Sequence, residues 1–441
     1  MAASVFDSPL YARLFDTGET GRLFSDTAAL RAMLLVEGAL AKAQGKHGVI
    51  PEISAAAIHR ATLEIQIDPG ALAKATGENG VCIPGLVAAF RAEMNAPEHA
   101  QYVHWGATSQ DIIDTGLMLR LRQALALAEA DLRTILTALA DQAEKHADLP
   151  MPARTYGQQA TPTSWGAVLA SWGAALLDAV DALPGLREQA LWVSLSGASG
   201  TSAALGPKAA QIRADLAQGL GLRDPHRSWH IDRGPILRII AWMAQVCATL
   251  AAIGQTVIGL SASEVQEVSL GAAGASSTMP QKQNPVRAST LVALSTQISG
   301  LQSTLQIAAT HQHQRDGAAW FAEWMIVPQI ALSTACALQH GVALARDIRP
   351  NPTRMAQAFE RGLDLAHSEA LSFALSQSMS RPKAQAAVKT LCQEALRSGT
   401  SLSNLARAQY PDLPASLFDP QAQLGEAPAD TRAFVARVRA L

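Results

Sequence analysis

The sequence is poor in charged residues, aromatic residues and cysteine. Of its 441 residues 16% are charged and 5% are aromatic, and the formal net charge is −2. It has no block of lysine and arginine, which argues against nucleic acid or a polybasic membrane anchor as a partner. The four cysteines form no CxxC pair, so neither a disulfide framework nor a thiolate metal site is expected. These absences favour a small-molecule partner and a cytoplasmic protein.

Two parts of the sequence bear on membrane insertion, the N-terminus and the segment 239–260. The N-terminus, MAASVFDSPLYARLF, lacks a basic segment followed by an apolar stretch, so no secretory signal is expected. The segment 239–260 carries no charge and is long enough to span a bilayer. Gln245 and Gln255 and the absence of basic flanks favour instead a helix buried at the centre of a bundle.

What the sequence does contain is helical pattern. Hydrophobic residues, chiefly alanine and leucine, make up 49% of the chain. Helical periodicity predicts five long helices, at 110–148, 164–195, 235–268, 286–312 and 328–348. Because an average helix has about 11 to 12 residues, these lengths indicate an extended bundle of helices. Sequence patterns typical of strands are nearly absent. We predict an all-α chain with an N-terminal helical domain at 1–109, a central bundle at 110–350 and a C-terminal helical domain at 351–441.

Three polar, glycine-containing segments interrupt the helical pattern. They read HWGATSQD at 104–111, ARTYGQQATP at 153–162 and GAAGASSTMPQKQNP at 271–285. Connections as long as the third segment are usually functional or disordered. These segments are the candidate sites.

The third segment resembles the signature GSxxMxxKxN of the fumarase/aspartase superfamily, with Ala275 in place of the usual glycine. The resemblance implies that a group is added or removed across a C–C bond next to a carboxylate, through a doubly charged aci-carboxylate. It also implies that Ser276 exchanges the proton at carbon while Lys282, Asn284 and backbone N–H groups stabilise the charge. Ser277 and Met279 of the same loop are expected to contact substrate. The plainer interpretation is a solvated Ser/Gly loop.

The first segment resembles the HxGxTSxD region of the same family. Thr108 or Ser109 can cap the helix that follows, and the free N–H groups of that helix then offer a site for a substrate carboxylate. The resemblance implies a catalytic role for His104 and substrate binding by Thr108 and Ser109. The plainer interpretation is a helix cap beside a partly buried histidine.

The second segment resembles the family's GRTHxQxAxP, in which Arg154, Thr155 and Gln158 are expected to bind substrate. Tyr156 stands where most members have a histidine, and Ser289 stands where the glutamate that orients this histidine is expected. Both halves of an acid pair are therefore missing. A lyase that expels an amine must protonate the nitrogen, whereas an enzyme whose nucleophile is a carboxylate needs no such acid.

Lactonisation of a muconate is such a reaction. The resemblance to bacterial 3-carboxy-cis,cis-muconate cycloisomerases extends through most of the chain, and GATSQDxxDTG, WxAEW and the nearby Arg315 are its more discriminating parts. It implies conversion of 3-carboxy-cis,cis-muconate to a carboxymuconolactone in protocatechuate degradation, without a metal or other cofactor. It also implies a homotetramer with shared sites, since helices of roughly 40 Å would hold the three segments of one chain apart.

Departures from the cycloisomerase pattern MPHKRNPVGA widen the choice of substrate. Gln281, Gln283 and Arg287 replace His, Arg and Gly, so one cation is lost and another is gained nearby. We expect Arg287 to contact an anionic substituent, and 3-sulfomuconate is an alternative substrate. Two further hypotheses are a lyase acting on adenylosuccinate or argininosuccinate, and a catalytically silent helical assembly.

Two histidine pairs have spacings that metal ligands use, namely His226 with His230 and His311 with His313. Neither pair has an obvious carboxylate or cysteine complement in the sequence. We therefore expect structural or solvated roles for them.

Overall fold

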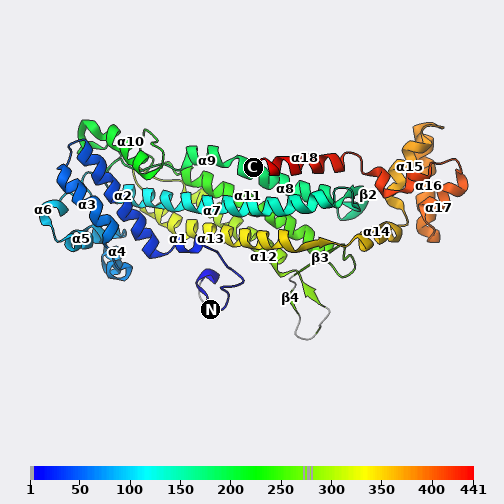
Figure 1. The fold of residues 1–441 in the computed structure, drawn as a ribbon, viewed down its shortest axis with the longest axis horizontal. Coiled ribbons are helices and arrows are strands. Elements are labelled where there is room, and N and C mark those ends of the chain that lie inside the picture. The colour runs from blue at the N-terminus through cyan, green and yellow to red at the C-terminus, as the bar shows by residue number, and fades with distance from the viewer. Residues whose placement is uncertain (1–3, 272–273, 276–278, 280–281) are drawn as a thin grey trace. The chain divides into compact units, whose positions relative to one another are not determined.

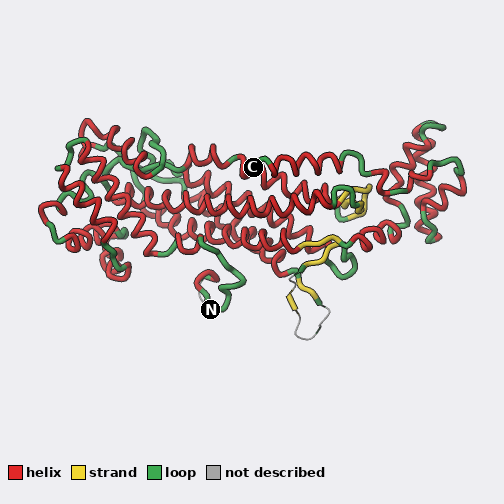
Figure 2. Tube along the Cα trace, viewed as in Figure 1, coloured by secondary structure: helices red, strands yellow, loops and turns green. Residues whose placement is uncertain are grey.

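The computed structural model describes residues 4–271, 274–275, 279 and 282–441, and helices make up most of it (Figures 1 and 2). The chain forms two compact units. The first comprises Met1–Ala130, Asp181–Cys247 and Leu294–Gln339, and the second comprises Asp131–Val180, Ala248–Ala293 and His340–Leu441. The division into 1–109, 110–350 and 351–441 stays a prediction.

Four long helices contribute to both units: α7 (Ser109–Lys145), α11 (Gly234–Leu260), α12 (Val286–Ala308) and α13 (Gly317–Asp347). In the second unit they pack closely around two glycines. A Cβ on Gly254 of α11 would lie 2.7 Å from the carbonyl oxygen of Ala288 in α12, and one on Gly341 of α13 would lie 2.9 Å from Ile135 of α7. A side chain is excluded at Gly254 because its neighbour is backbone, whereas at Gly341 the end of the Ile135 side chain would have to shift.

Three of the five predicted long helices differ clearly from the structure. The helix predicted at 235–268 ends at Leu260, in α11. The segment 164–195 is broken into α8 (Trp165–Asp181) and α9 (Leu183–Ala190), because Pro184 has no N–H to donate to the preceding turn. The helix predicted from Pro328 begins at Gly317 instead and continues through that proline. Its start is set by Asp316, whose carboxylate accepts the N–H of Ala319 at 3.2 Å in the manner of an N-cap.

Shorter helices complete the first unit: α1 (Thr20–Leu23), α2 (Asp26–Lys46), α3 (Glu52–Glu64), α4 (Ala73–Asn79), α5 (Ile83–Met94), α6 (Pro97–Ala100) and α10 (Ala209–Leu220). The second unit adds α14 (Pro352–Arg361), α15 (Ser368–Leu375), α16 (Arg381–Ser398), α17 (Leu402–Gln409) and α18 (Ala427–Arg439). Short 3-10 helices lie at Val5–Asp7, Pro69–Leu72, Ala203–Lys208, Leu365–His367, Ala415–Phe418 and Pro420–Gln423.

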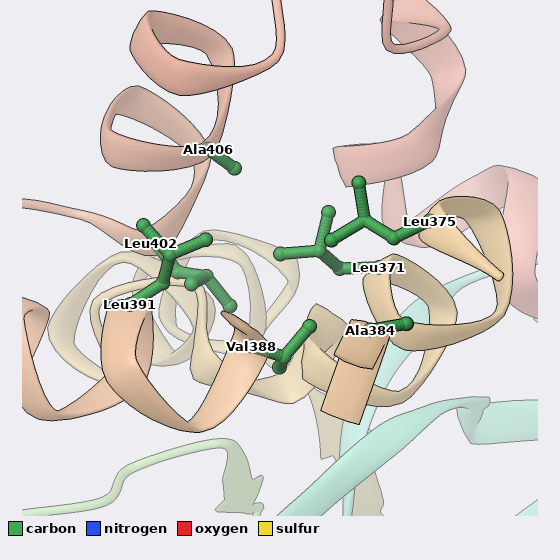
Figure 3. Packing of buried hydrophobic residues seen from close by; sticks show 7 residues of the cluster. All are labelled: Leu371, Leu375, Ala384, Val388, Leu391, Leu402 and Ala406. Atoms are coloured by element: carbon green, nitrogen blue, oxygen red, sulfur yellow. The ribbon is translucent and has the colours of Figure 1, made fainter. Parts of the chain in front are cut away.

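The helices α15, α16 and α17 share a small apolar core (Figure 3). Leu371, Ala384, Leu402 and Ala406 are fully buried in it. Its other buried members are Leu375, Val388 and Leu391. This part of the chain is therefore held together by its own hydrophobic contacts.

The strands form three two-stranded antiparallel sheets. They pair β1 (Pro150–Thr155) with β2 (Gln158–Ser164), β3 (Val268–Leu270) with β6 (Ile348–Pro350), and β4 (Gly274–Ala275) with β5 (Gln283–Asn284). The sequence pattern did not predict them.

Three helical segments are long and apolar enough to cross a membrane by length and composition alone: Trp165–Ala190, Gly234–Leu260 and Gly317–Asp347. In each, at least half of the most apolar 18-residue window is buried inside the protein, and the share is 56% for α11. The uncharged segment 239–260 thus lies in a helix that is partly buried inside the protein, and both of its glutamines, Gln245 and Gln255, are exposed.

Candidate active site

The second candidate segment is a β-hairpin. Its turn consists of Tyr156 and Gly157, whose φ angles of 51° and 75° are both left-handed, as a type I′ turn requires. Thr155 and Gln158 pair at the end of the ladder, and their side chains are exposed. Tyr156 is fully exposed. The phenol therefore has no part in the packing of the second unit.

Arg154 joins this hairpin to Glu267, the residue directly before β3. The strand β3 leads into the third candidate segment, 271–285, which we call the signature segment. Its Nη1 donates to Oε2 of Glu267 at 2.8 Å, and its Nη2 donates to Oε1 of the same carboxylate. The side chain of Glu267 is 1% exposed, and its backbone oxygen accepts the N–H of Asn351 at 2.8 Å. The predicted substrate-binding arginine is thus held by a buried protein carboxylate.

The signature segment is closed at its base by β4 and β5, which pair Gly274 with Asn284. Ser276 and Ser277 lie outside the described residues. Met279 and Lys282 are exposed, and the N–H of Lys282 donates to the carbonyl oxygen of Met279 at 3.0 Å. An exposed ammonium is available to an anionic substrate.

Gly271, the first residue of the signature segment, and Arg287, two residues after its end, both lie next to Asp347. The N–H of Gly271 donates to the carbonyl oxygen of Asp347 at 3.3 Å, and Nε of Arg287 lies 3.9 Å from its carboxylate. The side chains of Arg287 and Asp347 are each more than one third exposed. Water therefore screens this pair strongly.

In the first unit, His104 pairs with Glu37 through an Nδ1···Oε1 distance of 2.6 Å. Burial by itself would lower the pKa of His104, but the hydrogen bond and charge of Glu37 outweigh it, so the pKa is raised. His104 has a left-handed φ of 64°, and Gly106 follows at 71°. A Cβ on Gly106 would lie 2.6 Å from Leu205, so the loop requires glycine there.

The helix α7 begins at Ser109, and Thr108 precedes it. The Asp111 carboxylate accepts the N–H of Thr108 at 3.1 Å, which is one half of a capping box. The hydroxyl of Thr108 accepts a hydrogen bond from Nη2 of Arg315 at 2.9 Å, and the same Nη2 donates to the carbonyl oxygen of Ala198 at 3.0 Å. Two predicted substrate-binding residues, far apart in sequence, are therefore in contact.

Asp111 organises this part of the first unit, a role that the sequence pattern alone did not reveal. Its carboxylate accepts hydrogen bonds from the backbone of Ser196 and Gly197, each at 2.9 Å, and from the hydroxyl of Ser194 at 3.0 Å. It also lies 2.8 Å from Nε2 of the buried His230. The signal that could have identified it is the T-S-x-D spacing, which is typical of a capping box.

A second missed group is the buried ion pair of Arg233 with Asp114 and Glu323. Nε and Nη2 of Arg233 donate to Glu323 at 2.7 and 2.8 Å, and Nη1 and Nη2 donate to Asp114 at 2.8 and 3.1 Å. Trp320 donates its indole N–H to Asp114 at 3.1 Å. The two carboxylates raise the pKa of Arg233 although burial opposes this, so its charge is permanent.

The two histidine pairs divide into buried and exposed members. His230 and His311 have side chains exposed by 2% and 0%, against Asp111 and Glu323 respectively. His226 is exposed and has a left-handed φ of 56°, and His313 is also exposed. Among the described residues, no group of three or more His, Cys, Asp and Glu is arranged to hold a metal ion.

The chain is similar to known proteins over almost its whole length. A family model described as lyase matches residues 17–300. The 3-carboxy-cis,cis-muconate cycloisomerase of Pseudomonas aeruginosa is 37% identical over 447 aligned residues, which cover 98% of this chain and 96% of that protein. The chain belongs to the fumarase/aspartase superfamily. The fold class predicted from the sequence is therefore confirmed.

Other members of the superfamily show how far the similarity extends. The crystal structure of the 3-carboxy-cis,cis-muconate lactonizing enzyme from Pseudomonas putida superposes with a TM-score of 0.92 at 34% identity, covering 98% of this chain and 99% of that one. Nitrosuccinate lyase of Streptomyces davaonensis is 33% identical and covers 97% of this chain and 94% of that protein. The superfamily fold thus occurs in relatives with different named activities.

Proposed function

We propose that this chain is a 3-carboxy-cis,cis-muconate cycloisomerase, an intramolecular lyase that forms a carboxymuconolactone in protocatechuate degradation. The observation that carries the proposal is the end-to-end similarity, at 37% identity, to a relative of that name. Tyr156 supports it, because a carboxylate nucleophile removes the need for the acid that most family members carry at that position. Because Tyr156 lies exposed in the hairpin turn, the replacement of histidine by tyrosine at this position does not disturb the packing of the fold.

The reaction rearranges one molecule and takes up one proton, which solvent supplies. A substrate carboxylate oxygen bonds to its own conjugated double bond, and the electron pair passes into the neighbouring carboxylate to give the aci-carboxylate. Ser276 then donates a proton to carbon and is reprotonated from solvent. Lys282, Asn284 and backbone N–H groups stabilise the doubly charged intermediate, and His104 completes the catalytic set.

Arginines hold the anionic groups of the substrate in this proposal. The two hydrogen-bond acceptors of Arg315 are a hydroxyl and a carbonyl, so its charge is not matched by a contacting carboxylate among the described residues. Arg154 and Arg287, by contrast, face Glu267 and Asp347. We therefore assign Arg315 the strongest contact with substrate. The other proposed substrate-binding residues are Thr108, Ser109, Arg154, Thr155, Gln158, Ser277, Met279 and Arg287.

The proposal includes a cytoplasmic homotetramer with shared sites and no metal cofactor. After Arg287, α12 has no charged side chain, and it exposes Gln297, Ser299 and Thr304. An uncharged exposed helix face is typical of a surface that packs against another subunit. Light scattering should give a tetramer, and an active monomer at micromolar concentration would contradict this.

The absence of a metal cofactor is tested by chelation. Turnover should be unchanged after a chelator is added. Loss of turnover that is restored by one divalent ion would show a metal requirement.

The test of the function is a screen that follows the loss of muconate absorbance. It compares 3-carboxy-, 3-sulfo- and unsubstituted cis,cis-muconate, with adenylosuccinate and argininosuccinate as controls. We expect the 3-carboxy compound to be the best substrate. Turnover of 3-sulfomuconate alone would support the sulfonate as the substrate, and turnover of a control alone would refute the proposal.

Nitrosuccinate belongs in the same screen because a relative at 33% identity is named for it. Nitrite is a weakly basic leaving group, so its expulsion would also dispense with an acid at position 156. This elimination is therefore the second candidate function. Release of nitrite without any turnover of a muconate would favour it.

A further inference from the structure

The segment 309–316, which carries Arg315, is anchored by a buried ionic cluster formed by Asp114, Arg233, Glu323 and His311. The side chains of these four residues are exposed by no more than 2%. Arg233 donates to both oxygens of Glu323 and to both oxygens of Asp114. Such a doubly bidentate arrangement fixes the direction of each group as well as its distance.

On one side, the cluster fixes the chain around Arg315. Nε2 of His311, four residues before Arg315, lies 3.5 Å from Oε1 of Glu323. Asp316, directly after Arg315, accepts backbone N–H groups from Gln312 and Ala319, each at 3.2 Å. Arg315 therefore sits between two residues whose positions depend on the start of α13.

On the other side, the cluster fixes the two acceptors of Arg315. Asp114 lies three residues after Asp111 in α7, and Asp111 accepts the N–H groups of Thr108 and Gly197. Thr108 and Ala198, which directly follows Gly197, are the acceptors of Arg315. His230 and Arg233 come from the same connection and bind Asp111 and Asp114 respectively.

The charges in this region explain why Arg315 needs such support. The two acceptors that orient Arg315 are neutral, so they leave its positive charge available to bind an anion. Neutral acceptors, however, hold a long side chain only weakly. The buried cluster supplies the rigidity that these two hydrogen bonds lack. Replacing the cluster by apolar residues would preserve the packing and lose the fixed direction.

We propose that Glu323 is a positioning residue: through Arg233 and His311 it sets Arg315 against Thr108 in the geometry that binds an anionic group of the substrate. This inference rests on the proposed function. Glu323 itself touches no substrate. Its effect should therefore appear as a change in KM that depends on Arg315.

The experiment is a double-mutant cycle with Glu323→Gln and Arg315→Ala, measured on 3-carboxy-cis,cis-muconate. Glu323→Gln keeps the volume and removes the charge, and we expect KM to rise about tenfold while kcat changes by less than about threefold. In the Arg315→Ala background, the same substitution should change KM by less than about twofold. Glu323→Asp, which keeps the charge, should recover part of the loss.

The matched control is Glu129→Gln, which removes another carboxylate of the first unit that pairs with an arginine, Arg187, at 2.6 Å. It should leave KM unchanged. If Glu323→Gln raises KM equally with and without Arg315, the inference is wrong even though the enzyme is active. If Glu323→Gln lowers kcat alone, it is also wrong. An inactive wild type would instead refute the proposed function, on which the inference depends.

Discussion

Arg154 places both terminal nitrogens of its guanidinium against the carboxylate of Glu267, a side chain that is 1% exposed. The two residues are 113 positions apart in the sequence. The pair connects the hairpin β1–β2 to the residue directly before strand β3, which precedes the signature segment. An arginine that the family pattern assigns to substrate is thus also a structural residue of the second unit.

Removing Arg154 should therefore lower stability as well as activity. Arg154→Met leaves Glu267 buried and unpaired, which should cost on the order of 3 kcal/mol in the free energy of unfolding. The double variant Arg154→Met/Glu267→Leu should recover most of this loss, because it leaves no isolated buried charge. Urea unfolding at a fixed protein concentration measures the stability of the single and the double variant. Equal stability of the single and double variants would show that the carboxylate finds another partner.

Ser276 and Tyr156 should respond very differently to removal of their hydroxyl groups. Ser276→Ala should lower turnover by roughly 10² to 10⁴, the usual contribution of a positioned acid or base, with the fold intact. Tyr156→Phe should lower it about tenfold or less, because the exposed phenol would lose one hydrogen bond to substrate. The comparison is made at saturating substrate, with circular dichroism as the check on folding. Equal damage by both would place the phenol in proton transfer and remove the mechanistic argument for a cycloisomerase.

Arg287 should tune the choice of substituent on the muconate. Its 3.9 Å approach to Asp347 is partly exposed and holds it weakly, so the guanidinium can turn to an anion. Arg287→Gly, which restores the residue that cycloisomerases commonly have, should change the ratio of kcat/KM for the 3-carboxy and 3-sulfo compounds by about tenfold. Asp347→Asn serves as the control for the loss of the pair itself. An unchanged ratio would place Arg287 outside the site.

The pair of His104 with Glu37 should make stability depend on pH. The pKa of His104 is raised in the folded protein, so the stabilisation is fully present below the unfolded pKa of 6.5 and is lost as pH rises through the folded value. A tenfold increase in the proton affinity of the imidazole on folding corresponds to about 1.4 kcal/mol. The free energy of unfolding of wild type relative to His104→Gln, measured from pH 5 to 9, should therefore be largest at the acidic end. Glu37→Gln should flatten this dependence, and a difference that grows with pH would contradict the assignment.

Two glycine substitutions should have opposite effects. Gly106→Ala puts a Cβ 2.6 Å from Leu205 at a residue with φ of 71°, and should destabilise the protein by roughly 2 kcal/mol. Gly77 lies inside α4 with no atom within 4 Å of an added Cβ, so Gly77→Ala should stabilise it by about 0.5 to 1 kcal/mol. Thermal unfolding of the two variants side by side measures the contrast. Equal effects would mean that the loop before α7 adapts to a side chain.

The sequence by itself determined the helical class, the family and the approximate extent of the long helices. These depend on local patterns: apolar residues at helical spacing give α7 and α11, and the K-x-N signature identifies the third segment. It did not predict the β1–β2 hairpin, because PMPART and QQATPTS lack the β-branched alternation of strands. The turn at Tyr156 and Gly157 and the contacts of the surrounding fold determine that pairing instead.

The tertiary structure alone decided which charged residues meet. Arg233 contacts Glu323 from 90 residues away and Asp114 from 119. No local sequence pattern predicts such a contact, because each of these residues could equally be solvated at the surface of the protein. Their pairing follows from burial: once the long helices pack, a charge inside has no water and is stable only where an opposite charge reaches it. The packing of the helices therefore selects the partners of Arg233, and through them the place of Arg315.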